Sequence, residues 1–288
     1  MNGSLRATVL IPTIKNRGPL LPYSVGSVLA QTVSDIEVFV MGDGVDNDTR
    51  AVIQDLMAHD SRIKFFDNPK HRPRGEPNRH QALTEARGKI VCYLCDRDLM
   101  LPNHIEIVED LLTNTDFCHT LISYVEASVD NIKFVAEMDL SNASDRRWVL
   151  AGRARCIQDS IPLSFAAHTL DMYRKLPHGW RTTPDDIYTD IYMWEQFLSH
   201  SECRAASGMV PTILYFPRGR RTEWSVNEKL AELEHWSERI KLKSWNTSFL
   251  QTTINALAQD QIAKARQLRV PFVRRAYWKL RENVGLDG

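Results

Sequence analysis

The sequence predicts an α/β protein with a mostly parallel sheet flanked by helices. In the first hundred residues, short apolar runs with strand character alternate with stretches of helical length, and polar joints between them are short. Alternation of this kind indicates parallel strands connected by right-handed crossovers. After residue 102 the pattern changes to shorter elements and then to a helical C-terminal tail, so an addition to the sheet is expected there.

The elements of the first part follow from their periodicity and from the residues that end them. In order, we expect a strand at 8–11, a helix at 20–31, a strand at 36–41, a helix at 48–58, a strand at 63–66, a helix at 77–87 closed by Gly88, and a buried strand at 89–94.

The second part is less regular. We expect a helix at 103–112, two antiparallel strands at 117–125 and 132–136, a polar helix near 145–155, an apolar strand-like segment at 163–167, an amphipathic helix at 187–198, a last strand at 213–216, and helix from Ser225 onward. The expected domain therefore covers 1–224, with halves 1–101 and 102–224, and the helical extension covers 225–288.

The composition argues against several classes of protein. Thirty-six basic and thirty-six acidic residues cancel, so there is no overall charge for binding nucleic acid. Five scattered cysteines predict free thiols in a reducing compartment, and the pair Cys92 and Cys95 lacks a second pair for zinc. No apolar stretch reaches the roughly 20 residues that span a bilayer. We expect a cytoplasmic protein.

Two acids, Asp96 and Asp98, directly follow the buried strand at 89–94. They are expected at the carboxyl edge of the sheet, where open α/β sheets bind ligands. Carboxylate oxygens at such an edge suit Mg²⁺ or Mn²⁺, with phosphates and water as further ligands. The alternative is a solvated loop with two acids.

A third acid, Asp43, ends the strand at 36–41 between two glycines. It is expected at the same edge, although an acid after a strand also serves as a helix cap or turn former. Three neighbouring aspartates repel one another unless a cation or hydrogen-bond donors lie between them.

Taken together, these motifs resemble the family 2 glycosyltransferases with the GT-A fold. The residues that carry the resemblance are Ile11-Pro12-Thr13, Asn16-Arg17, Ser27 to Thr32, Asp35 to Val38, Asp43-Gly44, Asp48-Thr49, Asn78, Ala86-Arg87-Gly88, Tyr93 to Asp98 and Leu101 to His104. The match is dense over the first hundred residues and thins afterwards. Gly42 and Ile14 depart from the family pattern, which usually has an acid and an aromatic residue there.

The resemblance implies a nucleotide-diphosphosugar donor, bound by the half at 1–101, and an acceptor bound by the half at 102–224. The residues that it assigns to the donor are Pro12, Thr13, Asn16, Asp43, Asn78, Asp96 and Arg97. Thr13 and Asp43 would hold the base and ribose. Asp96 and Asp98 would bind ribose, diphosphate and Mn²⁺ or Mg²⁺, with Asp98 as the direct ligand.

Asp190, followed by an aromatic-rich stretch, is similar to the family's catalytic base. It would take the proton of an acceptor hydroxyl and invert the anomeric centre. Asp185 and Asp186 are rivals, and Asp190 could instead cap its helix. His168 could face the acceptor, complete the metal shell or serve the fold. Arg72, Arg74 and Arg79 could contact phosphates, but such a run more commonly forms a solvated basic loop. Arg218 to Arg221, after the last strand, could close over the diphosphate.

Two other functions remain open from the sequence. An aspartyl phosphatase-like hydrolase would use Asp96 as nucleophile. A nucleotide-sugar binding protein without catalysis would keep the site and lose turnover.

The tail at 262–281 mixes basic and apolar residues without an acid before Arg281. Such a helix can lie at a membrane surface, or it can pack on the domain with a solvated basic face. With a role in surface polysaccharide or glycoconjugate synthesis, the acceptor would be a saccharide or a lipid-linked sugar, and contact with the inner face of the membrane would be peripheral.

Overall fold

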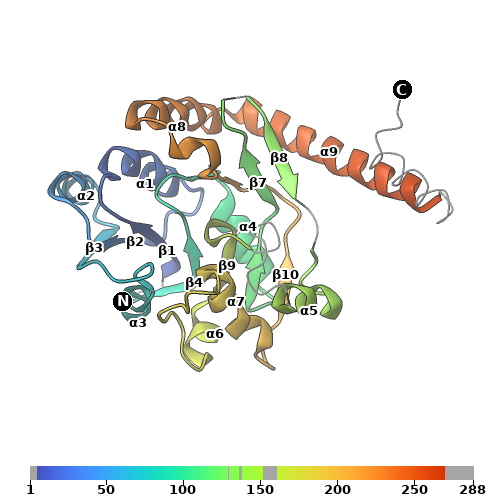
Figure 1. Cartoon of the computed structure of the whole chain (residues 1–288), viewed down its shortest axis with the longest axis horizontal. Coiled ribbons are helices and arrows are strands. Elements are labelled where there is room, and N and C mark those ends of the chain that lie inside the picture. Colours follow the sequence, from blue (N-terminus) through green and yellow to red (C-terminus); the bar gives the residue numbers. More distant parts are fainter. Residues whose placement is uncertain (1–4, 129, 136–137, 152–160, 270–288) are drawn as a thin grey trace. The chain divides into compact units, whose positions relative to one another are not determined.

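The structure is a computed structural model that describes residues 5–128, 130–135, 138–151 and 161–269 (Figure 1). The chain divides into two compact units, residues 1–243 and 244–288. In the described part of the second unit, the chain forms the helix α9 (Lys243–Arg269). No helix among the described residues is long and apolar enough to cross a membrane.

A seven-stranded sheet forms the centre of the first unit, in the order β10-β6-β9-β4-β1-β2-β3 (Figure 1). Its strands are β1 (Leu5–Thr13), β2 (Ile36–Asp43), β3 (Ile63–Asn68), β4 (Gly88–Tyr93), β6 (Phe117–His119), β9 (Ala166–Thr169) and β10 (Ala205–Ser207). β9 runs antiparallel to both of its neighbours, and the other pairs are parallel. The mostly parallel sheet is thus confirmed.

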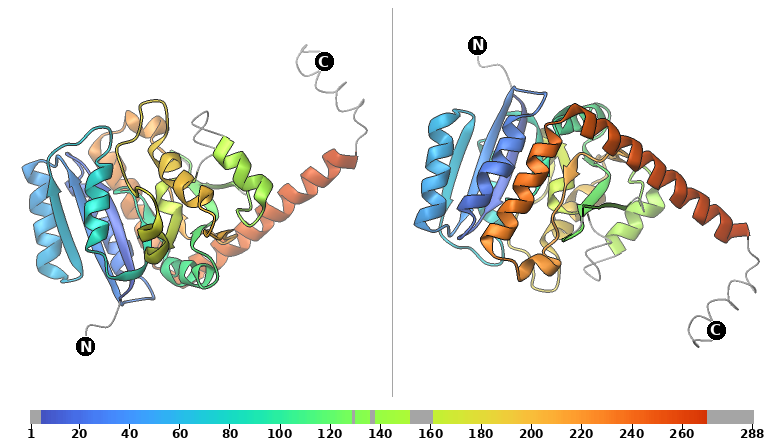
Figure 2. Two further views of the ribbon diagram at one scale, coloured as in Figure 1. Left: turned by 90° about the horizontal axis from the view of Figure 1, so that it is seen from below. Right: turned by 90° about the horizontal axis from the view of Figure 1, so that it is seen from above.

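Helices flank this sheet (Figure 2). They are α1 (Leu21–Leu29), α2 (Asn47–His59), α3 (Glu76–Thr84), α4 (His104–Leu112), α5 (Ala143–Ala151), α6 (Leu170–Lys175), α7 (Thr189–Ser199) and α8 (Val226–Ile240), with short 3-10 turns at Gly18–Leu20 (η1), Leu163–Phe165 (η3) and Gly219–Thr222 (η4). α8 packs on α1 and η1, with Leu233 and Trp236 buried. It therefore belongs to the first unit and closes one side of the sheet's carboxyl edge.

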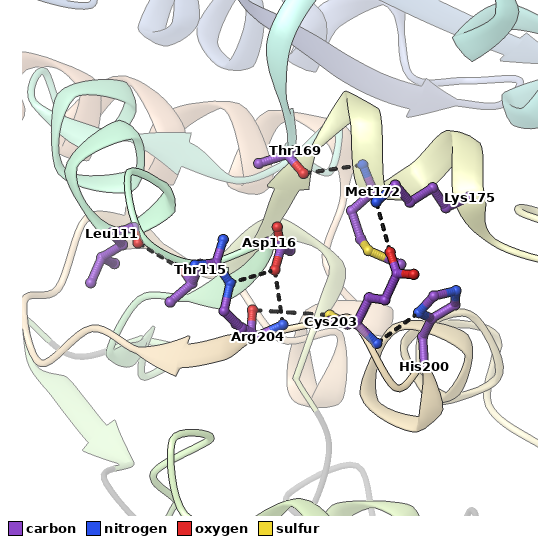
Figure 3. Close-up of polar contacts among 10 residues, drawn as sticks. Leu111, Thr115, Asp116, Thr169, Met172, Lys175, His200, Cys203 and Arg204 are labelled. Atoms are coloured by element: carbon purple, nitrogen blue, oxygen red, sulfur yellow. Dashed lines mark hydrogen bonds and ion pairs between the residues drawn. The ribbon is translucent and has the colours of Figure 1, made fainter.

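The sequence did not predict β10, whose place beside β6 depends on side-chain contacts. Asp116, just before β6, accepts hydrogen bonds from the backbone N–H of Arg204 at 2.9 Å and from its Nε at 3.1 Å (Figure 3). Because Arg204 directly precedes β10, this contact aligns the two strands at the edge of the sheet.

Two small antiparallel pairs complete the unit: β7 (Ile122–Val125) with β8 (Ile132–Val135), and β5 (Leu99–Met100) with β11 (Ile213–Leu214). The antiparallel addition was expected, but the single strand at 117–125 was not correct. Thr120 and Leu121 donate their N–H groups to Phe165 and Val210 instead of to a ladder. The chain therefore leaves the main sheet between β6 and β7.

Gly88 was predicted as a helix cap, whereas it begins β4 and α3 ends earlier, at Thr84. A Cβ at Gly88 would lie 2.2 Å from the backbone nitrogen of Thr8. The glycine is therefore needed for the close approach of β4 to β1. The expected helix near 145–155 is α5, and its final residues lie outside the described part of the chain.

Candidate active site

The carboxyl ends of β1, β2 and β4 bring the predicted acids to one edge of the sheet. Thr13 is in register with Gly42, so Asp43 lies one residue beyond the end of this pairing. The hydroxyl of Thr13 also donates to Oδ2 of Asp96 at 2.9 Å. Since Asp96 follows β4 on the other side of β1, three strands contribute to one site, as the sequence predicted.

Asp43 is neutralised by the loop before α3. Its Oδ1 accepts the N–H of His71 at 2.6 Å, and its Oδ2 pairs with Lys70. Gly75 has a left-handed φ of 71°, and a Cβ there would lie 3.0 Å from Cγ of Asp43. The loop thus wraps closely around this carboxylate.

Asp96 is buried and lies near the positive charges of Arg17, Arg97 and Arg218. Nε of Arg17 lies 3.8 Å from its Oδ2, the same oxygen that accepts from Thr13. Burial raises the pKa of Asp96 above its ordinary value, and the positive charge of Arg17 opposes this shift.

Asp98 has no exposed surface, and each of its carboxylate oxygens accepts a hydrogen bond from the protein. The hydroxyl of Ser164 donates to Oδ2 at 2.6 Å, and the backbone N–H of Phe216 donates to Oδ1 at 3.1 Å. Burial raises the pKa of Asp98 to about 6, while Arg97 and Ser164 oppose the shift. Neither hydrogen-bond donor was predicted from the sequence.

The turn η3 connects Asp98 with Asp190. Ser164 accepts the N–H of Cys95 at 3.0 Å while it donates to Asp98. The preceding residue, Leu163, donates its N–H to Oδ2 of Asp190 at 3.0 Å. Two adjacent residues of one turn therefore hold two acids that are 92 residues apart in the sequence.

Asp190 is the second residue of α7 and does not cap it. The N-cap position belongs to Tyr188, whose side chain makes no capping hydrogen bond. Burial raises the pKa of Asp190, and the charges of Arg79 and Arg74 oppose this. The rivals Asp185 and Asp186 are both exposed before the helix.

The other residues assigned to the donor lie around this edge. Pro12 is half-buried in β1, and Asn16 is exposed, with a φ of 61° and its N–H bonded to Asp46. Asn78 lies on α3, and within the described residues its Nδ2 is buried without a hydrogen-bond partner. Arg97 donates from Nε to the carbonyl of Phe216 at 2.9 Å.

Arg79 departs from the prediction of a solvated basic loop. Arg72 and Arg74 are exposed, but Arg79 is buried on α3 with its guanidinium 4.8 Å from the ring centre of Trp180. Its Nε and Nη1 have no hydrogen-bond partner in the described part of the chain. A polar group left in this state, near Asp190, is typical of a ligand site rather than of the fold.

His168 is a structural residue. It is fully buried, its Nδ1 donates to the carbonyl of Thr169 at 3.0 Å, and its Nε2 accepts from the hydroxyl of Tyr93 at 2.8 Å. Burial lowers the pKa of His168 to about 4. The ring is therefore neutral and has both nitrogens occupied.

Among the described side chains, no group of three or more His, Cys, Asp or Glu residues is arranged to hold a metal ion. The thiols of Cys92, Cys95, Cys118 and Cys203 are free, as expected. Assignment of Asp96 and Asp98 to Mn²⁺ or Mg²⁺ remains a prediction.

A family model described as glycosyl transferase family 2 matches residues 8–176, more than half of the chain. A GalNAc(5)-diNAcBac-PP-undecaprenol β-1,3-glucosyltransferase of Campylobacter jejuni is 34% identical over 96 residues, which are 33% of this chain and 31% of that protein. The chain thus spans about a third of that relative. An uncharacterised glycosyltransferase of Nostoc is 22% identical over 285 residues, covering 94% of this chain and 84% of its own length.

Two solved structures share the fold. A mannosyltransferase of Pyrobaculum calidifontis, in complex with GDP-Man and Mn²⁺, has a TM-score of 0.53 at 16% identity and covers 99% of this chain and 81% of its own. Residues 1–349 of TarS from S. aureus, in complex with UDP-GlcNAc, have a TM-score of 0.56 at 12% identity and cover 95% and 78%. Both likenesses concern the fold alone. Together with the family match, they show that this chain is a glycosyltransferase with the GT-A fold that belongs to glycosyl transferase family 2.

Proposed function

We propose that this protein transfers a sugar from a nucleotide diphosphosugar to an acceptor hydroxyl, with inversion at the anomeric carbon. One observation carries this proposal: the turn η3 holds Asp190 through Leu163 and Asp98 through Ser164. A general base therefore lies next to the edge at which the donor is expected. The nucleotide sugars bound by two structures of the same fold support the class of donor.

In the proposed reaction, Asp190 takes the proton of the acceptor hydroxyl. Burial raises its pKa, which makes the carboxylate a better proton acceptor near neutral pH. The positive charges of Arg79 and Arg74 oppose this rise in pKa. Thr13 and Asp43 hold the base and ribose, and Asp96 lies between them and the reacting sugar.

The proposal is tested with UDP-, GDP- and TDP-sugars in a thermal-shift panel, followed by measurement of nucleoside diphosphate release. A donor at 100 times its Kd should stabilise the protein by about 2.7 kcal/mol. A donor that binds without any release, with or without saccharide acceptors, would support a binding protein without catalysis. Release of phosphate from simple esters would instead favour the phosphatase.

For the acceptor, we propose a saccharide, including a lipid-linked one, since a relative is named for an undecaprenol-linked substrate. Residues 262–281 would then contact anionic lipids, although those from 270 on lie outside the described residues. Sedimentation with anionic vesicles at low salt should retain the full chain and release a form truncated after Gln261. Equal binding of the two forms would contradict this role.

A further inference from the structure

A pocket of about 250 Å³ lies beside Asp96 and is lined by arginines. Arg17 and Arg97 flank Asp96, and Arg218 comes from the segment after β11. Ile14 and Leu20 supply part of its apolar wall. The pocket is therefore placed to receive the charged end of a ligand whose other part lies at the strand ends.

Not every cation of this pocket is available to a ligand. Arg221 donates to both carboxylate oxygens of Glu232 at 2.6 Å, and Lys229 donates to the carbonyl of Trp224 at 2.7 Å. Glu232 is thus already neutralised. Of the other arginines, Arg97 uses its Nε on the carbonyl of Phe216, Arg17 lies 3.8 Å from Asp96, and Arg218 completes the group.

These guanidinium groups are close enough to repel one another. Partial burial, followed by the positive charges of Arg97, Arg17 and Arg74, lowers the pKa of Arg218 below its ordinary value. Arginines gathered in this way are destabilising unless an anion joins them, and a phosphate accepts several guanidinium hydrogen bonds at once.

The acids of the site fit a divalent cation less well than the arginines fit a phosphate. Asp98 has no exposed surface and both oxygens occupied, and Oδ2 of Asp96 is occupied by Thr13 and faces Arg17. Mg²⁺ and Mn²⁺ need at least one accessible carboxylate, and positive charges nearby weaken their binding.

We infer that Arg17, Arg97 and Arg218 bind the diphosphate of the donor in place of a divalent cation held by Asp96 and Asp98. This inference rests on the proposed function. When the bond between the anomeric carbon and the phosphate oxygen breaks, its electron pair moves to the leaving nucleoside diphosphate. The acceptor oxygen forms the new bond and loses its proton to Asp190. The three guanidinium groups stabilise the negative charge that develops on the departing phosphate.

The test is calorimetric titration of UDP, GDP and pyrophosphate in excess EDTA and in Mn²⁺. It compares the wild-type chain with Arg218→Gln, and Arg220→Gln is the matched control. Arg220 lies in the same turn but does not line the pocket, and its charge acts on Glu126. We expect Kd values without metal and with Mn²⁺ to agree within about threefold. Arg218→Gln should weaken binding about tenfold, as loss of a charged hydrogen bond implies, and Arg220→Gln should not.

The same titrations separate this inference from the proposed function. Nucleotide binding that disappears in EDTA and returns with Mn²⁺ would overturn the arginine site and leave the nucleotide donor intact. Another outcome is a chain that binds pyrophosphate in EDTA, in a manner that depends on Arg218, and binds no nucleotide. That result would support the anion site and contradict the proposal of a nucleotide-sugar donor. Binding of neither probe would overturn both.

Discussion

The two ends of one short segment, Tyr93 and Asp96, differ in how their polar groups are satisfied. The hydroxyl of Tyr93 accepts from Nε1 of Trp180 at 3.0 Å and donates to His168 at 2.8 Å. Tyr173 and Trp180 complete this cluster, with an N–H to hydroxyl hydrogen bond of 3.1 Å. Asp96, three residues later, lies among arginines that repel one another.

The polar groups around Tyr93 therefore serve the fold, whereas those around Asp96 are available to a ligand. In the aromatic cluster of Tyr93, His168, Tyr173 and Trp180, neutral groups satisfy one another, so ligands have nothing to add. At the arginine edge, the positive charges of Arg17, Arg97 and Arg218 lie close together, so an anionic ligand lowers the free energy of the site. We therefore expect changes in the cluster to affect stability and changes at the edge to affect turnover.

The largest effect is expected for Asp190→Asn. Loss of the general base should lower kcat for sugar transfer by at least about a hundredfold, while the unfolding midpoint stays the same or rises, because a buried charge is removed. Donor titration provides the binding control, and exposed Asp185→Asn is the matched variant. An unchanged kcat with a collapsed donor affinity would transfer the role of base to another acid.

Tyr93→Phe should lower stability and leave turnover unchanged, which is the opposite of the result expected for Asp190→Asn. It removes one oxygen and leaves Nε1 of Trp180 and Nε2 of His168 buried without partners, at a cost of about 1–3 kcal/mol for an unsatisfied group. Urea unfolding should show this loss, with KM for the donor unchanged. Tyr23→Phe, on α1, is the control. A loss of turnover without a loss of stability would contradict the assignment of the aromatic cluster to the fold and of the arginine edge to function.

Ser164→Ala tests the turn that joins Asp98 to Asp190. The variant leaves Oδ2 of Asp98 and the N–H of Cys95 without their partner, so we expect a loss of about 1 kcal/mol in unfolding free energy together with a lower kcat. Ser164→Thr keeps the hydroxyl and should recover part of both. Full activity in the alanine variant would show that the turn does not position the acids.

A further effect concerns the dependence of stability on pH. Burial lowers the pKa of His168 and His119 to about 4 and that of His104 to about 3. Between pH 6.5 and 4 the unfolded chain therefore binds protons that the folded chain does not, and stability falls as pH falls. Asp98, with its pKa raised to about 6, acts in the opposite direction. Unfolding free energy should decrease by about 1 kcal/mol or more from pH 6.5 to 5, and an increase would contradict the neutral histidines.

The sequence alone determined the order of elements in the first hundred residues. Strands such as β2, buried along its whole length, are mostly apolar. Asp43 ends β2, and Asp96 and Asp98 follow β4 within a few residues. Parallel pairing then places their ends at one edge, because β1, β2 and β4 run in the same direction. Local periodicity and the order of the motifs were sufficient for the fold and the family.

Only the tertiary structure decided what each acid contacts. Ser164 and the N–H of Phe216, which hold Asp98, are 66 and 118 residues away in the sequence, and nothing in their local pattern marks them. The same holds for the burial of Arg79. The sequence marked Arg218 to Arg221 only as a group, and the structure shows that Arg221 is paired with Glu232 while Arg218 lines the pocket. Hydrogen bonds and charge repulsion depend on distances of a few ångströms between distant segments, and periodicity along the chain carries no information about those distances.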